Sequence, residues 1–299
     1  MSTIVVGYVL SIISSLFSAL YVLPKKISGQ KPVIYAALMG AGYFAASVIG
    51  YAVLAGFHVI DEPILFPHAA IACINGVIWM IASVSVLISI DQIGLAKSNQ
   101  WKGLQGPIGS ILMLVFFSEF RSAKLIYMLL AIVLITLAAL MFSTRDHHNV
   151  PVQKTGIVYA LVSAVFFGIS AALWKLLTDE GAYFNQQIYQ SLFITLSAVL
   201  YTRLKYGTLK LDTRHKKREI ILPIIGGLLF FGNASFNLLA NRYIEASIAF
   251  MLHQLNTIWL FLFGVFVFHE INFKKHWIRL LTGLMLSAIG VFMLVLAKV

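Results

Sequence analysis

The feature that most constrains this chain is a series of long apolar stretches separated by short polar links. About 20 apolar residues in a helix cross the roughly 30 Å hydrocarbon layer of a membrane. Of all residues, 60% are hydrophobic and 11% are charged, whereas a soluble domain has about 45–50% and about 25% respectively. The sequence therefore predicts an integral membrane protein.

The apolar stretches divide into ten predicted spans. Only helices and closed barrels satisfy every backbone polar group in lipid, and these stretches lack the alternating pattern of a barrel strand. We therefore expect an all-α membrane fold of ten helices, with no separate soluble domain. The predicted spans are 4–23, 33–54, 66–88, 93–118, 123–143, 155–177, 186–203, 220–240, 245–268 and 273–297.

The two halves of the chain share a pattern of residues. Gly76, Ile93 and Glu119 recur 151 residues later as Gly227, Ile244 and Glu270, and the first predicted span matches the sixth at an offset of 149. Five spans per copy would invert the second copy in the membrane, an arrangement typical of secondary transporters. We expect repeats at 1–149 and 150–299 within one membrane domain. Chance similarity between apolar helices is the alternative.

The distribution of Lys and Arg predicts an orientation. Most of the 22 basic residues fall in the odd-numbered links, with the densest group between Arg203 and Arg218. Cytoplasmic links carry an excess of basic residues. We therefore expect the odd-numbered links to lie in the cytoplasm and both termini to lie outside.

Polar side chains occur inside the third and eighth predicted spans. Asn75 and Trp79 share one helix face, as do Asn233 and Asn237, because each pair is spaced four residues apart. Polar groups at membrane depth are costly and usually face a cavity or a partner. Two interpretations stay open: these residues line a transport path, or they form interhelical hydrogen bonds that hold the bundle.

The fourth predicted span is the least apolar one. It contains Asn99, Trp101, Lys102 and Gln105 ahead of Pro107, and a proline inside a helix kinks or breaks it. Trp101, like Trp79, can stack on a sugar ring or a cation, or lie at the membrane interface. No carboxylate lies one turn from Lys102, so we expect its ammonium to reach the cytoplasmic face.

The ninth predicted span contains His253, Gln254 and Asn256 well inside its ends. Imidazole exchanges a proton near neutral pH, which makes His253 a candidate for substrate binding and for proton coupling. A neutral histidine bonded across helices is the alternative.

Other polar features are assigned packing or boundary roles. We expect Trp174 to anchor its helix at the interface, and Glu119 and Glu270 to act structurally at span ends. Small residues permit close helix approach, which explains a serine stripe on the first span. The stripe consists of Ser11, Ser14, Ser15 and Ser18.

No enzyme signature is found in the sequence. It has no nucleophile elbow, no glycine-rich phosphate loop and no His or Cys set with metal-ligand spacing. We therefore expect no catalytic residue, no cofactor and no metal. The net charge of +11 is explained by cytoplasmic links, so we do not expect nucleic acid as a partner.

Several segments resemble a known family. The 5+5 plan, with glutamates ending the fourth and ninth spans, resembles the drug/metabolite transporter superfamily. Within it, the chain is most similar to the glucose/ribose porter family of sugar-uptake proteins. The resemblance implies ten helices, a cavity between the repeats and proton-driven sugar uptake, but superfamily members also carry amino acids, choline, nucleotide sugars and drugs. The similar segments are Asn75–Trp79, Ile93–Ser98, Gln254–Thr257 and Phe268–Glu270.

These observations predict a secondary active transporter of a small polar metabolite in the bacterial inner membrane. A sugar suits the site, because amides bond hydroxyls and aromatic rings stack on sugar faces. The alternatives are an exporter of amino acids, drugs or other small metabolites, and a non-transporting scaffold or enzyme. Expected partners are the substrate, membrane lipid and, for symport by alternating access, protons. The expected substrate-binding residues are Asn75, Trp79, Asn99, Trp101, Gln105, Asn233, Asn237, His253, Gln254 and Asn256.

Overall fold

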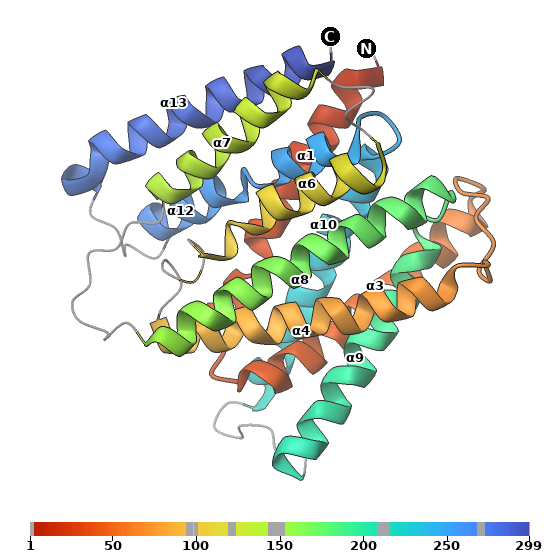
Figure 1. Cartoon of the computed structure of the whole chain (residues 1–299). Helices are drawn as coiled ribbons and strands as arrows, with labels where there is room; N and C mark the ends of the chain where they lie inside the picture. Colours follow the sequence, from red (N-terminus) through yellow and green to blue (C-terminus); the bar gives the residue numbers. More distant parts are fainter. Residues whose placement is uncertain are drawn as a thin grey trace.

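All regular structure in the described part of the chain is helical (Figure 1). The computed structural model describes residues 3–93, 98, 101–118, 124–142, 153–207, 216–267 and 273–298. The helices are α1 (Thr3–Leu20), α2 (Leu23–Ile27), α3 (Pro32–Gly56), α4 (Ala69–Ile93), α6 (Gln105–Phe116), α7 (Leu125–Phe142), α8 (Lys154–Asp179), α9 (Asn185–Tyr206), α10 (Lys216–Ala240), α11 (Ala246–His253), α12 (Asn256–Phe266) and α13 (Phe273–Lys298).

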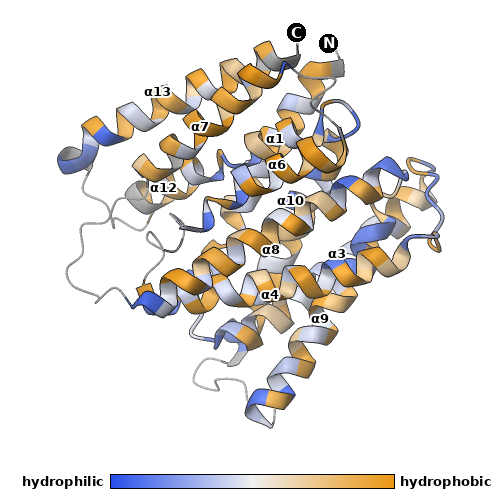
Figure 2. Cartoon of the chain, in the orientation of Figure 1, coloured by the Kyte–Doolittle hydropathy of each residue, from blue (hydrophilic) through white to orange (hydrophobic). Residues whose placement is uncertain are grey.

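Six helical segments among the described residues are long and apolar enough to cross a membrane. Apolar residues run along the lengths of the helices, and hydrophilic residues gather in loops and at helix ends (Figure 2). The expected all-α fold is confirmed, while the count of ten spans in two inverted repeats stays a prediction. The six segments are Ile4–Ile27, Pro32–Gly56, Ala69–Ile93, Lys154–Asp179, Lys217–Ala240 and Lys275–Leu294.

Two predicted spans are interrupted. The ninth is divided into α11 and α12 by a turn at Gln254 and Leu255, whose N–H groups bond to carbonyls three residues back. The fourth contains α6, which begins only at Gln105, after a turn at 103–104. Pro107 was expected to break this helix, yet it lies in the first turn of α6, where backbone N–H groups have no intrahelical partner.

Contacts between a helix of the first half and a helix of the second half come in matching pairs, in which the two halves exchange roles. The pair α4·α8 corresponds to α1·α10, the pair α4·α9 to α3·α10, and the pair α6·α8 to the contacts of α11 and α12 with α1. The pairs α3·α9 and α7·α13 join equivalent helices, and Figure 1 shows α7 and α13 side by side. Each half therefore packs mainly against the other half.

Glycine permits two of these crossings. A Cβ at Gly76 of α4 would collide with the backbone of α9, and a Cβ at Gly227 of α10 would collide with the backbone of α3. Small residues let helix backbones approach closely. The recurrence of Gly76 as Gly227 thus corresponds to two equivalent close crossings.

Two carboxylates tie a loop of one half to the other half. Glu62, in the loop before α4, accepts the backbone N–H groups of 183–185 on Oε2 at 3.0, 2.7 and 3.1 Å. An anion is favourable there because those groups begin α9. Glu219, in the first turn of α10, accepts the Ser28 hydroxyl at 2.6 Å and the Gly29 N–H at 3.2 Å. Polar contacts at these loops thus help to hold the two halves of the chain together.

Candidate substrate site

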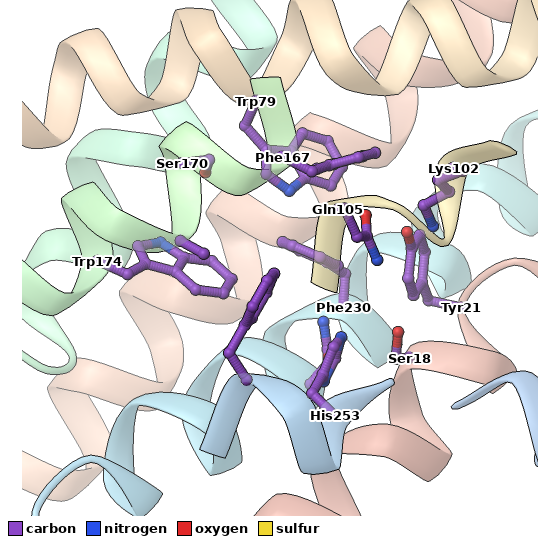
Figure 3. Close-up of a pocket in the computed structure, with 13 residues that line it drawn as sticks. Ser18, Tyr21, Trp79, Lys102, Gln105, Phe167, Ser170, Trp174, Phe230 and His253 are labelled. Carbon is purple, nitrogen blue, oxygen red and sulfur yellow. The ribbon is translucent and has the colours of Figure 1, made fainter. Parts of the chain in front are cut away.

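A cavity of about 40 Å³ lies where helices of both halves meet (Figure 3). Its wall is formed by α1 and the turn after it, α4, α6 and the residues just before it, α8, α10 and α11. A polar cavity of this size holds about three water molecules. The lining residues are Ser18, Tyr21, Trp79, Lys102, Gln105, Phe167, Ser170, Ala171, Trp174, Phe230, Asn233, Phe250 and His253.

An aromatic cluster covers one part of the cavity. The ring centroids of Trp79 and Phe230 are 4.6 Å apart, and those of Trp79 and Phe167 are 5.8 Å apart at an interplanar angle of 73°. Phe230 also contacts Tyr21 edge-on, with centroids 5.1 Å apart. Such rings fix one another and offer apolar faces to a ligand. This part of the cavity wall is therefore aromatic.

His253 connects the cavity to α1 and α10. The Ser14 hydroxyl donates to Asn233 Oδ1 at 3.0 Å and lies 3.1 Å from His253 Nδ1. Which of the Ser14 hydroxyl and His253 Nδ1 donates depends on the imidazole tautomer. If the single Ser14 hydrogen is donated to Asn233, Nδ1 donates to the Ser14 oxygen and the other ring nitrogen of a neutral imidazole is an acceptor. His253 thus bonds across helices and also lines the cavity, while its role in substrate binding and proton coupling stays a prediction.

The two helix interruptions meet through their glutamines. Gln105 Nε2 donates to Gln254 Oε1 at 3.2 Å, and these residues are 149 positions apart. Asn256, at the start of α12, donates its Nδ2 to the Ser18 hydroxyl at 2.9 Å. The side-chain amides at the two interruptions therefore bond to each other and to α1.

The structure brings four of the ten expected site residues into the cavity wall, and whether any binds substrate stays a prediction. Asn75, Asn237, Gln254 and Asn256 are buried outside the lining, and Trp101 is partly buried outside it. Asn75 forms no hydrogen bond with the described residues through its amide. Asn99 lies outside the described residues. The four in the wall are Trp79, Gln105, Asn233 and His253.

Two lining residues were expected elsewhere. Lys102 does not reach the surface: it is 8% exposed, and its Nζ lies 5.1 Å from the centroid of Phe167. Lys102 lies directly before the turn at 103–104 that precedes α6, and its side chain lines the cavity. Trp174 does not anchor an interface: it is buried and donates its indole N–H to Gln190 at 2.7 Å.

Sequence reasoning also missed the contribution of α8. Phe167, Ser170, Ala171 and Trp174 all line the cavity. They follow the spacing i, i+3, i+4, i+7, which places them on one helix face. That regular spacing was the signal available in the sequence.

Comparison with known proteins gives the family. A family model described as sugar transport protein matches residues 19–297. The chain belongs to the sugar transport protein family. The resemblance seen in the sequence is thereby confirmed, and together with the apolar helices it makes this family member an integral protein of the bacterial cell membrane.

Relatives in the sugar transport protein family are distant. A probable glucose uptake protein of Priestia megaterium is 24% identical over 251 residues, covering 81% of this chain and 82% of the relative. The glucose uptake protein GlcU of Bacillus subtilis is 23% identical over 237 residues, covering 76% and 78%. A crystal structure with a TM-score of 0.68 and 14% identity, covering 99% of this chain and 97% of the other, supports the fold alone.

Proposed function

We propose that this chain is a secondary active transporter that takes up a sugar, with the cavity as its substrate site. The observation that carries the proposal is the composition of the wall. It combines the adjacent rings of Trp79 and Phe230, which are tilted by 52° to each other, with polar groups of Ser18, Asn233 and His253. Rings suit the apolar face of a sugar, and amides and hydroxyls suit its edge. Family membership and the relatives named for glucose uptake support the same substrate class.

Alternating access is the mechanism that we propose. In this proposal, residues 1–149 and 150–299 are inverted five-helix repeats, each contributing five membrane segments. Support comes from the exchange of helix contacts between the halves and from the Gln105–Gln254 bond between their interruptions. Rocking of one repeat against the other opens a site at their interface to each side in turn.

The size of the cavity fits such a cycle. A volume of about 40 Å³ is smaller than a monosaccharide, so the sugar enters only when the walls separate. The contacts of α4 with α8 and of α1 with α10 border this region. Movement at these contacts widens the cavity, and closure brings the aromatic cluster onto the bound ring.

His253 is the residue that we propose for proton coupling. Its Nδ1 is engaged with Ser14, and the remaining nitrogen can accept a proton or a sugar hydroxyl. Protonation adds a charge beside Asn233 and Ser14, whose hydrogen bonds must then rearrange. Proton binding and sugar binding are thus linked through the same three side chains.

Uptake by purified protein in proteoliposomes tests the proposal. We expect a radiolabelled monosaccharide from a panel that includes glucose to accumulate when the outside is acidic relative to the lumen. Trp79→Ala should raise KM strongly, whereas Trp277→Ala, at an exposed position of α13, should leave uptake unchanged. The proposal fails if no sugar enters above the level of empty liposomes.

The role of His253 has a separate test. His253→Gln should abolish accumulation driven by the pH gradient while sugar exchange between preloaded vesicles and medium continues. Gradient-driven accumulation that survives in His253→Gln would exclude this residue as the coupling group.

A further inference from the structure

Lys102 introduces a charge into the cavity that the proposed sugar site does not explain. The side chain is 8% exposed and lines the cavity. Figure 3 shows it on the same side of the cavity as Gln105 and Tyr21. Its closest described interaction is with the ring of Phe167, whose centroid is 5.1 Å from Nζ. No described residue forms a hydrogen bond or an ion pair with the Lys102 ammonium.

The cavity wall, in the part of the chain that the structure describes, contains no carboxylate. The described acidic residues lie in loops or near helix ends, as Glu62 and Glu219 do. Asp91 near the end of α4 is exposed, and Asp179 pairs with Lys175 at the end of α8. The positive charge of Lys102 therefore has no described counter-ion across the cavity.

A buried ammonium without a counter-ion is costly, and a cation–π contact offsets only part of that cost. A ligand that places an anionic oxygen next to Nζ offsets much more of that cost, because charge-assisted hydrogen bonds are the strong ones. Neutral hydroxyl groups can accept from Nζ, but they leave the charge uncompensated. A carboxylate, with one negative charge, matches one ammonium, whereas a phosphate carries about −1.5 to −2.

We propose that the substrate is a sugar acid and that Lys102 binds its carboxylate. This inference rests on the proposed function, because it assigns the substrate class of the same site. The sugar ring stacks on Trp79 and Phe230, the carboxylate faces Lys102, and the hydroxyls face Ser18 and Asn233. Lys102 is then the residue that separates acidic from neutral sugars.

Ligand binding to the detergent-solubilised protein tests this assignment. Trp79 and Trp174 line the cavity, so tryptophan fluorescence reports occupancy. The probes are D-glucuronate, its neutral isostere D-glucuronamide and D-glucose. We expect glucuronate to bind about ten- to a hundredfold more tightly than glucuronamide, the size expected for one hydrogen bond to a charged group.

Variants test whether Lys102 causes the preference for glucuronate over glucuronamide. Lys102→Met should lose this preference. Lys102→Arg retains the charge and should keep the preference, which gives a second readout if Lys102→Met folds poorly. Lys217→Met, at an exposed position on α10, is the matched control and should behave as the unmodified protein does. A preference for glucuronate that persists in a folded Lys102→Met variant would overturn the assignment.

The remaining outcomes separate this inference from the proposed function. If glucose binds and glucuronate does not compete, the sugar site stands and the carboxylate assignment is wrong. If glucose binds only with chloride present, and this dependence vanishes in Lys102→Met, an inorganic anion occupies the position and the assignment is also wrong. If none of the sugars binds or is taken up, the proposed function itself fails.

Discussion

Replacing Gly76 or Gly227 by alanine probes two close helix crossings in the described part of the fold. A Cβ at Gly76 would lie 2.4 Å from the carbonyl oxygen of Gln190, and one at Gly227 would lie 2.2 Å from that of Met39. Both oxygens belong to the backbone of the facing helix, so they cannot turn away as the end of a side chain can. Each substitution must therefore push two helices apart.

The expected loss of stability follows from two opposing effects. Overpacking of a well-packed interior costs about 1–3 kcal/mol, and a contact with a rigid backbone oxygen belongs at the upper end. Alanine recovers up to about 1 kcal/mol relative to glycine inside a helix. The net destabilisation is about 2 kcal/mol for each variant, which lowers the unfolding midpoint by about 4–8 °C if each kcal/mol shifts it by 2–4 °C.

Thermal unfolding in one detergent, at one scan rate, measures this effect, because unfolding of such a protein is generally irreversible. Gly56→Ala is the matched control: Gly56 also lies in a helix, and an added Cβ there meets nothing within 4 Å. Its midpoint should stay the same or rise slightly. If Gly76→Ala and Gly227→Ala unfold at the same temperature as Gly56→Ala, the close crossings do not limit packing and the argument is refuted.

Three further predictions concern polar contacts. Glu62→Gln should destabilise the fold by about 1–2 kcal/mol in thermal unfolding, because three backbone N–H groups lose an ionised acceptor; Asp61→Asn, at its exposed neighbour, should not. A double-mutant cycle of Gln105→Ala and Gln254→Ala should give a coupling energy of at least about 0.5 kcal/mol, whereas strict additivity would show that the bond contributes nothing. Trp174→Phe should weaken sugar binding, measured by calorimetry, because loss of the indole N–H leaves the buried amide oxygen of Gln190 without this donor. An unchanged affinity would show that this hydrogen bond does not support the site.

The sequence was sufficient to predict an all-helical membrane fold, because the length of an apolar stretch directly constrains a segment that crosses lipid. It was weaker on where helices stop. Pro107 indicated an interruption, but the helix begins two residues before it, and Pro107 is accommodated in the first turn. The turn at Gln254 and Leu255 has neither proline nor glycine. Its position coincides with the Gln105–Gln254 contact, a tertiary interaction that local sequence does not encode.

The candidate site was partly predictable for a similar reason. Trp79, Asn233 and His253 were found because polar and aromatic groups deep inside an apolar span need a partner or a cavity. Helix face alone did not identify the lining, since Asn75 shares a face with Trp79 but lies outside the wall. Lys102 and Trp174 were assigned to the surface by the usual preference of such side chains for the membrane interface. Their true positions depend on where α6 begins and how far α8 extends.

Corresponding positions in the two halves meet at the cavity but differ in chemistry. Trp79 and Phe230, which are 151 residues apart, are both aromatic, and their rings pack against each other at a tilt. Lys102 and His253 have the same separation, yet one is an ammonium without a described polar partner and the other an imidazole held by Ser14. A ligand therefore meets similar aromatic surfaces from both halves and different polar groups. In the proposed alternating-access cycle, such a site would bind an asymmetric molecule in one orientation.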